Sequence, residues 1–204
     1  MTRVAIIYHS GYGHTRVQAE AVRDGARSVP GVQVDLVAVD DSPYPWEVLD
    51  RADAIIFGSP TYMAGVSAPF KAFLDATASR WAEQGWKDKL AAGFTNSAGI
   101  NGDKLAALQH LALFAMQHGM VWVGLGLLPG NHSSTGTPED LNRLASFVGA
   151  MAQSPADLGP EAGPSASDRR TAEHLGKRVA RIARGWHPDA GDADRSATAS
   201  TVAA

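Results

Sequence analysis

Five short apolar runs, separated by longer segments, constrain the fold more than any other feature of this sequence. Most of the runs are β-branched or aliphatic and end at glycine, proline or small polar residues, which is typical of strands buried in a sheet. They span Val4 to Tyr8, Val32 to Val37, Ala54 to Gly58, Leu90 to Thr95 and Val121 to Leu125. Each run is therefore predicted to form a strand.

The segments between the runs have the residue spacing of helices. Apolar residues recur every three or four positions in residues 15–28, 69–81 and 104–117. Strands that alternate with helices predict a parallel sheet whose two faces are both covered by helices. Right-handed crossovers leave few topologies, and five strands are the simplest. We therefore expect an α/β fold with a doubly wound, five-stranded parallel sheet in three layers.

The pattern is weaker after residue 126. Residues 128–153 are glycine-rich at first and then predict a partly helical segment. Residues 154–167 are rich in proline, glycine, serine and alanine and predict a loop, whereas residues 168–184 predict a last helix with Ser167 as its N-cap. The small and polar residues 187–204 predict a disordered tail without a catalytic role. We place a single domain at residues 1–186.

Composition narrows the class of protein. The 204 residues suit one α/β domain, and the formal net charge of −3 gives no indication of a nucleic-acid or membrane-surface partner. The chain contains no cysteine, which excludes disulfides and a cysteine nucleophile and is consistent with a cytoplasmic protein. No apolar run is long enough to span a bilayer, and no signal peptide precedes the first strand.

The seven histidines do not predict a metal site. His9 and His14 are five positions apart, and His110 and His118 are eight apart on one predicted helix. Neither spacing is a common ligand pattern, and no group of acidic residues nearby completes one. We therefore expect no bound metal.

The loop after the first strand, Ser10 to Thr15, has the composition of a phosphate-binding turn. It lacks the lysine of a Walker A loop, and Arg16 stands where a dinucleotide fingerprint has its third glycine. Exposed backbone N–H groups, two hydroxyls and the start of a helix instead suit a phosphate monoester. An ordinary turn before a helix is the alternative.

Two further loops favour a ligand site. Residues 58–65 (GSPTYMAG) follow the third strand, and residues 95–104 (TNSAGINGDK) follow the fourth. Both are small and nearly uncharged. Because the carboxyl ends of parallel strands meet at one edge of the sheet, the three loops would form a slot for a flat polar ring with a phosphate tail.

The sequence resembles the flavodoxin-like family and, within it, the NAD(P)H:quinone oxidoreductases of the WrbA type. The similar stretches are YHSGYGHT (8–15), GSPTYMAG (58–65), KAFLDATASRW (71–81), KLAAGFTNSAG (89–99) and QHGM (117–120), in the family's order. The resemblance implies the strand order 2-1-3-4-5, an FMN cofactor, and NADH or NADPH as co-substrate. It also implies a homodimer or homotetramer.

The resemblance assigns cofactor contacts to three groups of residues. The first loop would hold the FMN phosphate, and the other two would line the isoalloxazine ring. The residues concerned are Ser10, Gly11, Tyr12, Gly13, His14, Thr15, Pro60, Thr61, Tyr62, Met63, Ala64, Gly65, Thr95, Asn96, Ser97, Ala98, Gly99 and Asn101.

Five residues are candidates for contact with a substrate. The resemblance places Tyr12 near the nicotinamide donor and Trp81 where the family has a tryptophan that reaches the neighbouring subunit's flavin. Gln117 replaces the first histidine of a His-His-Gly-Met stretch, and Phe147 replaces a family tyrosine. His132, just past the fifth strand, lies near the predicted slot.

These features predict an FMN-dependent oxidoreductase. A hydride would pass from NAD(P)H to the flavin, and two electrons would then pass to a quinone-like acceptor at the same place, which implies ping-pong kinetics. No acid–base side chain is required. The alternative is a flavodoxin-type electron carrier that uses one-electron FMN chemistry, and a third possibility is a flavoprotein that regulates a partner.

Overall fold

The computed structural model describes residues 1–40 and 43–186, so the predicted tail at 187–204 lies outside the described residues. The strands are β1 (Thr2–Tyr8), β2 (Val32–Ala38), β3 (Ala54–Tyr62), β4 (Gly65–Val66), β5 (Leu90–Ser97), β6 (Val121–Trp122) and β7 (Ala150–Gln153). The helices are α1 (His14–Arg27), α2 (Trp46–Asp50), α3 (Ala68–Ala76), α4 (Ala78–Ala82), α5 (Lys104–Gln117) and α6 (Ala166–Gly185).

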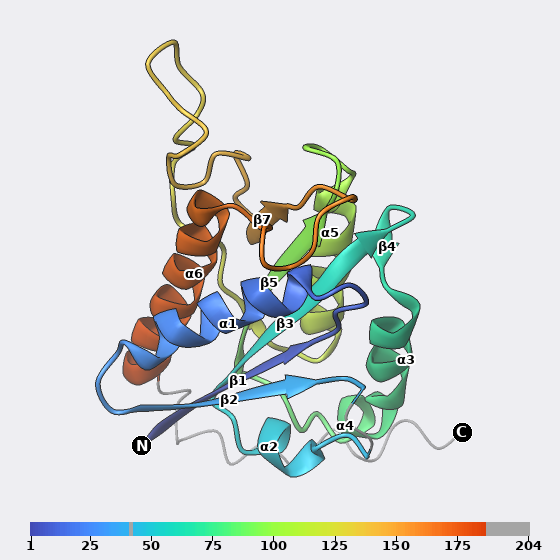
Figure 1. Ribbon diagram of the computed structural model, residues 1–204. Coiled ribbons are helices and arrows are strands. Elements are labelled where there is room, and N and C mark those ends of the chain that lie inside the picture. The colour runs from blue at the N-terminus through green and yellow to red at the C-terminus, as the bar shows by residue number, and fades with distance from the viewer. Residues whose placement is uncertain (41–42, 187–204) are drawn as a thin grey trace.

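The main sheet has the order β2-β1-β3-β5-β6, with every pair parallel. Because β5 is the fourth long strand, this order confirms the predicted 2-1-3-4-5 arrangement. The ladder between β3 and β5 continues to Ser59 opposite Thr95 and Pro60 opposite Asn96. The two strands therefore end side by side and deliver their following loops to the same edge of the sheet (Figure 1).

The predicted fifth strand, Val121 to Leu125, is shortened to Val121–Trp122, and a second short strand, β7, completes this edge of the sheet. β6 pairs with the start of β5, at Leu90 and Ala91, and β7 pairs with its end, from Phe94 to Ser97. Between them the chain leaves the sheet, and part of this excursion projects beyond the helices as the yellow loop in Figure 1.

The prediction that residues 128–153 are partly helical is wrong. Asn142 and Ala145 have left-handed φ values of 52° and 55°, which interrupt any helix. Asn142 is held in this conformation because its side chain binds the backbone of Leu127 and of Ser146, while its own N–H donates to Thr171. These partners are distant in sequence or specific to this turn, so helical periodicity could not reveal them.

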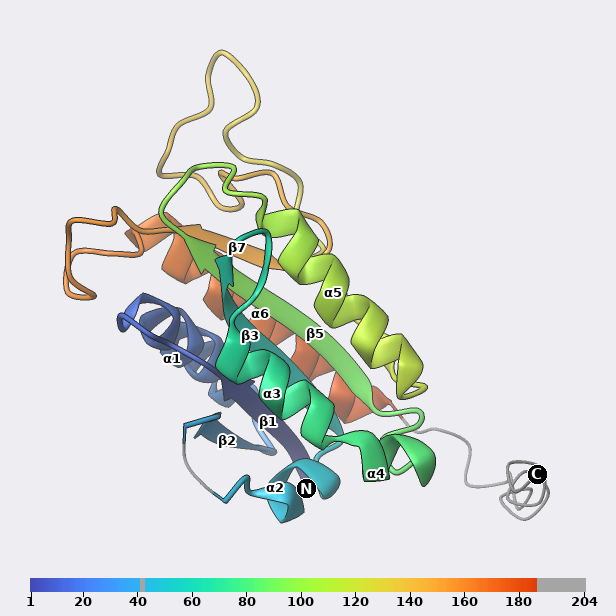
Figure 2. The ribbon, with the colours of Figure 1, turned by 90° about the vertical axis from the view of Figure 1, so that its right-hand side faces the viewer.

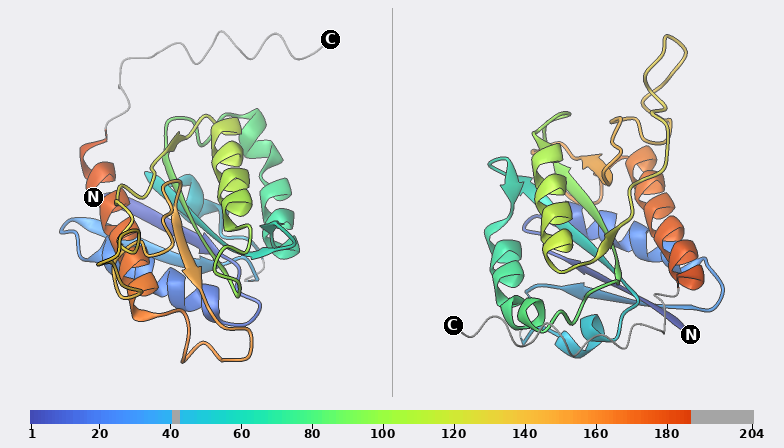
Figure 3. Two further views of the ribbon diagram at one scale, coloured as in Figure 1. Left: turned by 90° about the horizontal axis from the view of Figure 1, so that it is seen from above. Right: turned by 180° about the vertical axis from the view of Figure 1, so that it is seen from behind.

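Two hydrophobic cores lie on opposite faces of the sheet. Alternate residues of β1 divide between them: Val4 and Ile6 pack with α1 and α6, whereas Ala5 and Ile7 pack with α2, α3 and α5. Figure 2 and Figure 3 show the resulting three layers, with the sheet between the two sets of helices. None of the helices in the described ranges combines the length and apolar character needed to cross a membrane.

Two helix boundaries differ from the prediction. The segment 69–81 is two helices, α3 and α4, because Thr77 turns its hydroxyl back to the carbonyl of Leu74 at 2.7 Å and takes a non-helical ψ of 1°. Ser165, not Ser167, is the N-cap of α6 and accepts from the N–H of Asp168. The Ser167 hydroxyl instead donates a hydrogen bond to the carbonyl of Pro138.

Helices α1 and α6 cross with their backbones in close contact. A Cβ placed on Gly176 of α6 would lie 1.9 Å from the carbonyl oxygen of Val22, and one placed on Gly25 of α1 would lie 1.9 Å from that of Glu173. Glycine is therefore required at both positions by the space between the helices, although neither position has a left-handed backbone.

We expect Gly176→Ala to destabilise the protein by about 2 kcal/mol, because the two helices must move apart to admit a methyl group. Gly185→Ala is the matched control, since Gly185 lies in the same helix with nothing within 4 Å of its added Cβ. The control should leave the free energy of unfolding unchanged or slightly higher. Urea denaturation measures both, and equal stabilities would contradict the close contact.

Candidate functional site

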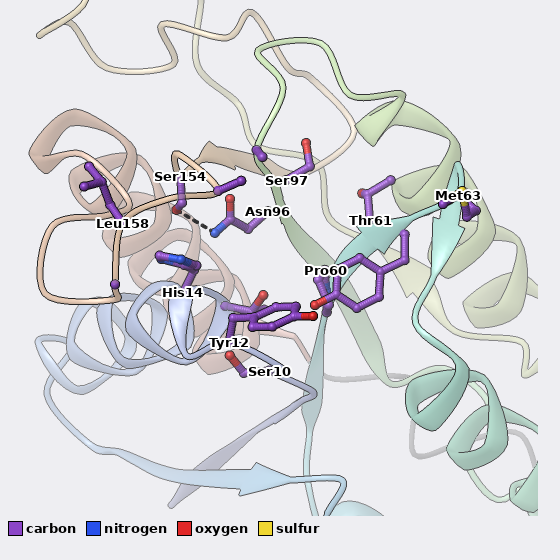
Figure 4. A pocket seen from close by; sticks show the side chains of 15 residues that line it. Ser10, Tyr12, His14, Pro60, Thr61, Met63, Asn96, Ser97, Ser154 and Leu158 are labelled. Carbon is purple, nitrogen blue, oxygen red and sulfur yellow. Dashed lines mark hydrogen bonds between the residues drawn. The ribbon is translucent and has the colours of Figure 1, made fainter.

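A cavity of about 800 Å³ opens at the carboxyl ends of β1, β3 and β5 (Figure 4). Its lining comes from the three predicted loops and from a fourth segment after β7. The lining residues are Ser10, Tyr12, His14, Thr15, Pro60, Thr61, Tyr62, Met63, Asn96, Ser97, Ala98, Ser154, Ala156, Leu158 and Gly159. None of them is an acid, a lysine or an arginine, so recognition inside the cavity depends on neutral polar groups.

The first loop presents the N-terminus of α1 to this region. Gly13 is the N-cap residue, with a left-handed φ of 90°, and no side chain caps the helix or places an acid in its first turn. The Ser10 hydroxyl accepts from the N–H of Arg16 at 3.0 Å and so fixes the start of the loop. The free N–H groups and the dipole of α1 make this end of the cavity suitable for an anion.

The second loop is a tight hairpin between β3 and β4. Its central residues, Met63 and Ala64, both have left-handed φ values, 46° and 60°, as a type I′ turn requires. Met63 is fully exposed beside the cavity, and the Tyr62 hydroxyl lies 3.0 Å from where a Cβ of Gly11 would stand. Burial raises the pKa of Tyr62, and nearby Tyr12 raises it further, so the Tyr62 hydroxyl keeps its proton at neutral pH.

Buried polar contacts tie the loops together from below. The Thr61 and Thr95 hydroxyls lie 2.7 Å apart and connect the ends of β3 and β5. His9, at the end of β1, contacts the Ser67 hydroxyl through Nδ1 at 2.8 Å, and the Ser67 N–H donates to Ser59. These contacts fix the first and second loops relative to each other, and no local sequence pattern indicates the His9–Ser67 contact.

The fourth segment, residues 154–163, lines one side of the cavity and was missed by sequence reasoning. Pro160 packs against Gly13, where an added Cβ would lie 2.8 Å from its ring, and the carbonyl of Gly163 lies 3.1 Å from Nδ1 of His14. The composition of residues 154–163 correctly predicted a loop but not its position. That position follows from the pairing of β7 with β5, which brings the loop to the same edge of the sheet as the other three.

Lys104, the first residue of α5, holds the loop after β5 from beneath. Its side chain is fully buried, and Nζ donates to the carbonyls of Gly99, Ile100 and Asn101 at 2.5, 2.8 and 3.2 Å. Burial lowers the pKa of this ammonium group to about 8. Gly99 and Asn101 consequently face Lys104 with their carbonyls and do not line the cavity.

Comparison with known proteins identifies the family. The chain is 43% identical to flavodoxin FldP of Pseudomonas aeruginosa, covering 92% of this chain and all of that protein. It is 33% identical to an NAD(P)H dehydrogenase (quinone) of Archaeoglobus fulgidus, over 90% of this chain and 98% of that protein. The crystal structure of a WrbA-like flavodoxin from Agrobacterium tumefaciens matches with a TM-score of 0.72 and 42% identity, over 92% of this chain and all of the other.

The chain belongs to the WrbA-type, flavodoxin-like family. A family model described as NADPH-dependent FMN reductase also matches residues 46–133. This range contains β3, β5 and the two loops that follow them. The matched range therefore includes two of the four segments that line the cavity.

Eleven of the residues predicted to contact the flavin meet in the cavity of this flavodoxin-like domain: Ser10, Tyr12, His14, Thr15, Pro60, Thr61, Tyr62, Met63, Asn96, Ser97 and Ala98. The other seven, Gly11, Gly13, Ala64, Gly65, Thr95, Gly99 and Asn101, shape the loops without lining it. Gly13 lines a second cavity, of about 390 Å³, that shares Ser10 and Tyr12 with the first. Their contacts with a flavin stay predictions.

Of the residues predicted to contact a substrate, only Tyr12 lines the cavity. It is 78% exposed, as a residue that covers an open ring site needs to be. His132 and Phe147 lie on the excursion between β6 and β7. Trp81 and Gln117 lie near the carboxyl ends of helices that run back from the cavity edge, so a single chain does not bring them to the cavity (Figure 2).

A buried ion pair anchors the excursion to the cavity. Arg143 donates to both carboxylate oxygens of Asp168, at 2.8 and 2.7 Å, and Asp168 also accepts from the N–H of Gln153. The Gln153 side chain then donates to the carbonyl of Ala98 at 2.9 Å. The excursion, β7 and the loop after β5 thus form one connected unit.

We expect the stability contributed by Lys104 to depend on pH. Its pKa falls from the ordinary 10.5 to about 8 on folding, so the unfolded chain binds more protons than the folded chain between these values. The free energy of unfolding of the wild type should therefore rise relative to Lys104→Met as the pH increases from 8 to 10. Urea denaturation at pH 7, 8, 9 and 10 measures the difference.

The exposed Lys87 provides the control for this titration. Lys87→Met should track the wild type across the same pH series. A difference between the wild type and Lys104→Met that stays constant with pH would contradict the role of burial.

Proposed function

We propose that this protein is an FMN-dependent oxidoreductase that takes electrons from NADH or NADPH and delivers them to a quinone-like acceptor. The observation that carries the proposal is the uncharged cavity between four loops, with an uncapped helix N-terminus at one end. A flat neutral ring with a phosphate tail matches both features. The similarity to NAD(P)H dehydrogenases (quinone) supports the same activity.

The residues present fit FMN. The volume of about 800 Å³ lies in the range of cofactor sites, and the start of α1 offers N–H groups without a competing acid. In addition, Asn96 is buried, lines the cavity, and has a side-chain oxygen without a partner. A carboxamide is a neutral polar group of the kind that can meet the edge of a flavin ring.

The chain's own groups would bind and orient the cofactor. The N–H groups of the first loop and the Thr15 hydroxyl would hold the phosphate, and Asn96 and Ser97 would lie at the ring edge. Tyr12 and Tyr62 would cover the ring while leaving room for donor and acceptor. When bound, FMN supplies the redox chemistry, accepting a hydride and passing on two electrons.

Donor and acceptor would use the same cavity in turn. Among the described lining residues, the exposed aromatic side chains are Tyr12 and Tyr62, and the exposed aliphatic ones are Met63 and Leu158. A nicotinamide and a quinone are both flat and would occupy the same side of the ring. Release of the oxidised nicotinamide before the quinone binds gives ping-pong kinetics.

An electron-carrier function is the second candidate, because flavodoxin FldP is a relative over the full length of that protein. Carriers dock on protein partners through charged surfaces around the flavin, whereas the 15 lining residues here include no acidic or basic side chain other than His14. The uncharged cavity favours a small, uncharged acceptor.

We expect purified protein with FMN to oxidise NADH or NADPH when benzoquinone is supplied. Initial rates at several fixed quinone concentrations should give parallel lines in double-reciprocal plots. FMN binding without NAD(P)H turnover would instead favour the carrier, and a protein that binds no FMN would contradict both functions.

We expect Gly13→Ala to weaken FMN binding about tenfold, because alanine is strained at φ 90° and its Cβ would meet Pro160. Riboflavin, which has no phosphate, should lose less affinity than FMN. Gly31→Ala is the matched control, since Gly31 has φ 79° with open space around it and lies outside the cavity lining. Fluorescence titration measures both flavins, and an equal loss in the control would contradict the role of Gly13.

The oligomer stays a prediction. Trp81, 52% exposed, and Gln117 would contribute to catalysis only if a second subunit brought them to a cavity. Sedimentation of the FMN-loaded protein measures the assembly directly.

A further inference from the structure

The second cavity, of about 390 Å³, adjoins the first on the side of the first loop that faces β2. Its lining residues are Tyr8, Ser10, Tyr12, Gly13, Arg16, Ala38, Asp40 and Pro160. Ser10 and Tyr12 line both cavities, so the two are neighbours. The volume lies within the range of small-molecule sites and is about half that of the first cavity. The second cavity therefore has room for one further group of a ligand.

The end of β2 places an acid in this cavity. The ladder between β1 and β2 continues to Tyr8 opposite Ala38, and the N–H of Val39 donates to the carbonyl of Tyr8 at 2.8 Å. Asp40 follows directly, so it lies beside the first loop and lines the cavity. None of the ion pairs formed within residues 1–40 and 43–186 includes Asp40. Its carboxylate is therefore available to accept hydrogen bonds from a ligand.

Arg16 brings a charge of the opposite sign to the same cavity. Its guanidinium approaches the carboxylate of Glu20 only to 4.0 Å, and both side chains are exposed, so this ion pair is weak. Gly13, the N-cap residue of α1, also lines the cavity. A phosphate between Gly13 and Arg16 would meet the start of a helix and a guanidinium that can bind it with two hydrogen bonds.

An acid, a guanidinium and a helix start are the groups that bind one end of a nucleotide. In dinucleotide-binding folds, a carboxylate near the end of the second strand accepts from the ribose hydroxyls, while the diphosphate lies at the N-terminus of the first helix. The first loop departs from the fingerprint of those folds at Arg16. The sheet nevertheless places Asp40 and the start of α1 in the corresponding positions. The exposed ring of Tyr12 offers a face for a base.

We propose that the second cavity binds the adenosine 5′-phosphate end of a dinucleotide, with Asp40 accepting hydrogen bonds from the ribose hydroxyls and Arg16 paired with the phosphate. FAD and the nicotinamide donors both carry this group. The site lies outside the cavity proposed for FMN and extends the proposed function. Its first test uses adenosine 5′-phosphate (AMP) alone and needs no redox activity.

Titration calorimetry of the full chain measures AMP binding, first without flavin and then with saturating FMN. We expect AMP to bind in both cases, with dissociation constants that differ by less than about threefold. Asp40→Ala should raise the dissociation constant of AMP about tenfold and leave that of FMN unchanged. Absence of AMP binding would overturn the proposal, as would displacement of AMP by FMN, because AMP would then occupy the first cavity.

Asp24→Ala is the matched control. Asp24 is an exposed acid of α1 that lines neither cavity, and its substitution changes the net charge by the same amount. AMP affinity should remain that of the wild type. A loss equal to that of Asp40→Ala would show a general effect of charge and overturn the role of Asp40.

A change in the ligand keeps the test decisive if Asp40→Ala does not fold. Wild-type protein should bind 2′,3′-dideoxy-AMP, which lacks both ribose hydroxyls, about tenfold more weakly than AMP. Equal affinities for the two nucleotides would contradict the assignment of Asp40 to the ribose.

The Asp40→Ala variant also distinguishes the two sources of the adenosine group. An approximately tenfold loss of FAD affinity would assign the cavity to a flavin dinucleotide, whereas an equal rise in the KM for NADH with unchanged kcat would assign it to the donor. A change in neither would overturn a role in dinucleotide binding. If the wild type bound AMP but not FMN, the proposed function would fail while the AMP site would stand.

Discussion

The parallel pairing of β3 with β5 is the constraint on which the cavity depends. Because the ladder continues to Pro60 opposite Asn96, both strands end at the same level and their loops begin side by side. β1 brings the first loop to this edge, and β7 brings the fourth. A shift of one residue between β3 and β5 would exchange the faces of every side chain, so that Asn96 would no longer line the cavity.

Buried polar groups then fix the loops without placing charge in the cavity. Lys104 and the Arg143–Asp168 pair carry charge, but Lys104 donates to loop carbonyls, and Arg143 and Asp168 bind each other and Gln153. The charged groups thus hold the loops from behind while neutral groups line the interior. This division is suited to a neutral ring, because a nearby fixed charge would favour one redox state over the other.

Buried polar groups differ in whether they find hydrogen-bond partners within the chain. The Thr61–Thr95 pair and the Asn142 side chain find partners within the chain and stabilise the fold. The Asn96 oxygen has no such partner among the described residues, although Asn96 is one of the residues that line the cavity.

The sequence by itself determined the parallel α/β sheet and three of the four cavity loops, because apolar runs and glycine-rich turns are local signals, and its resemblance to a known family implied the strand order. Only the tertiary structure decided the rest. The shortening of the predicted fifth strand, the break at Thr77, the cap at Ser165 and the folding of residues 154–163 over Gly13 depend on partners that lie elsewhere in the chain. Likewise, the orientation of the Asn96 amide follows from Ser154, 58 positions away, and no local pattern encodes such a contact.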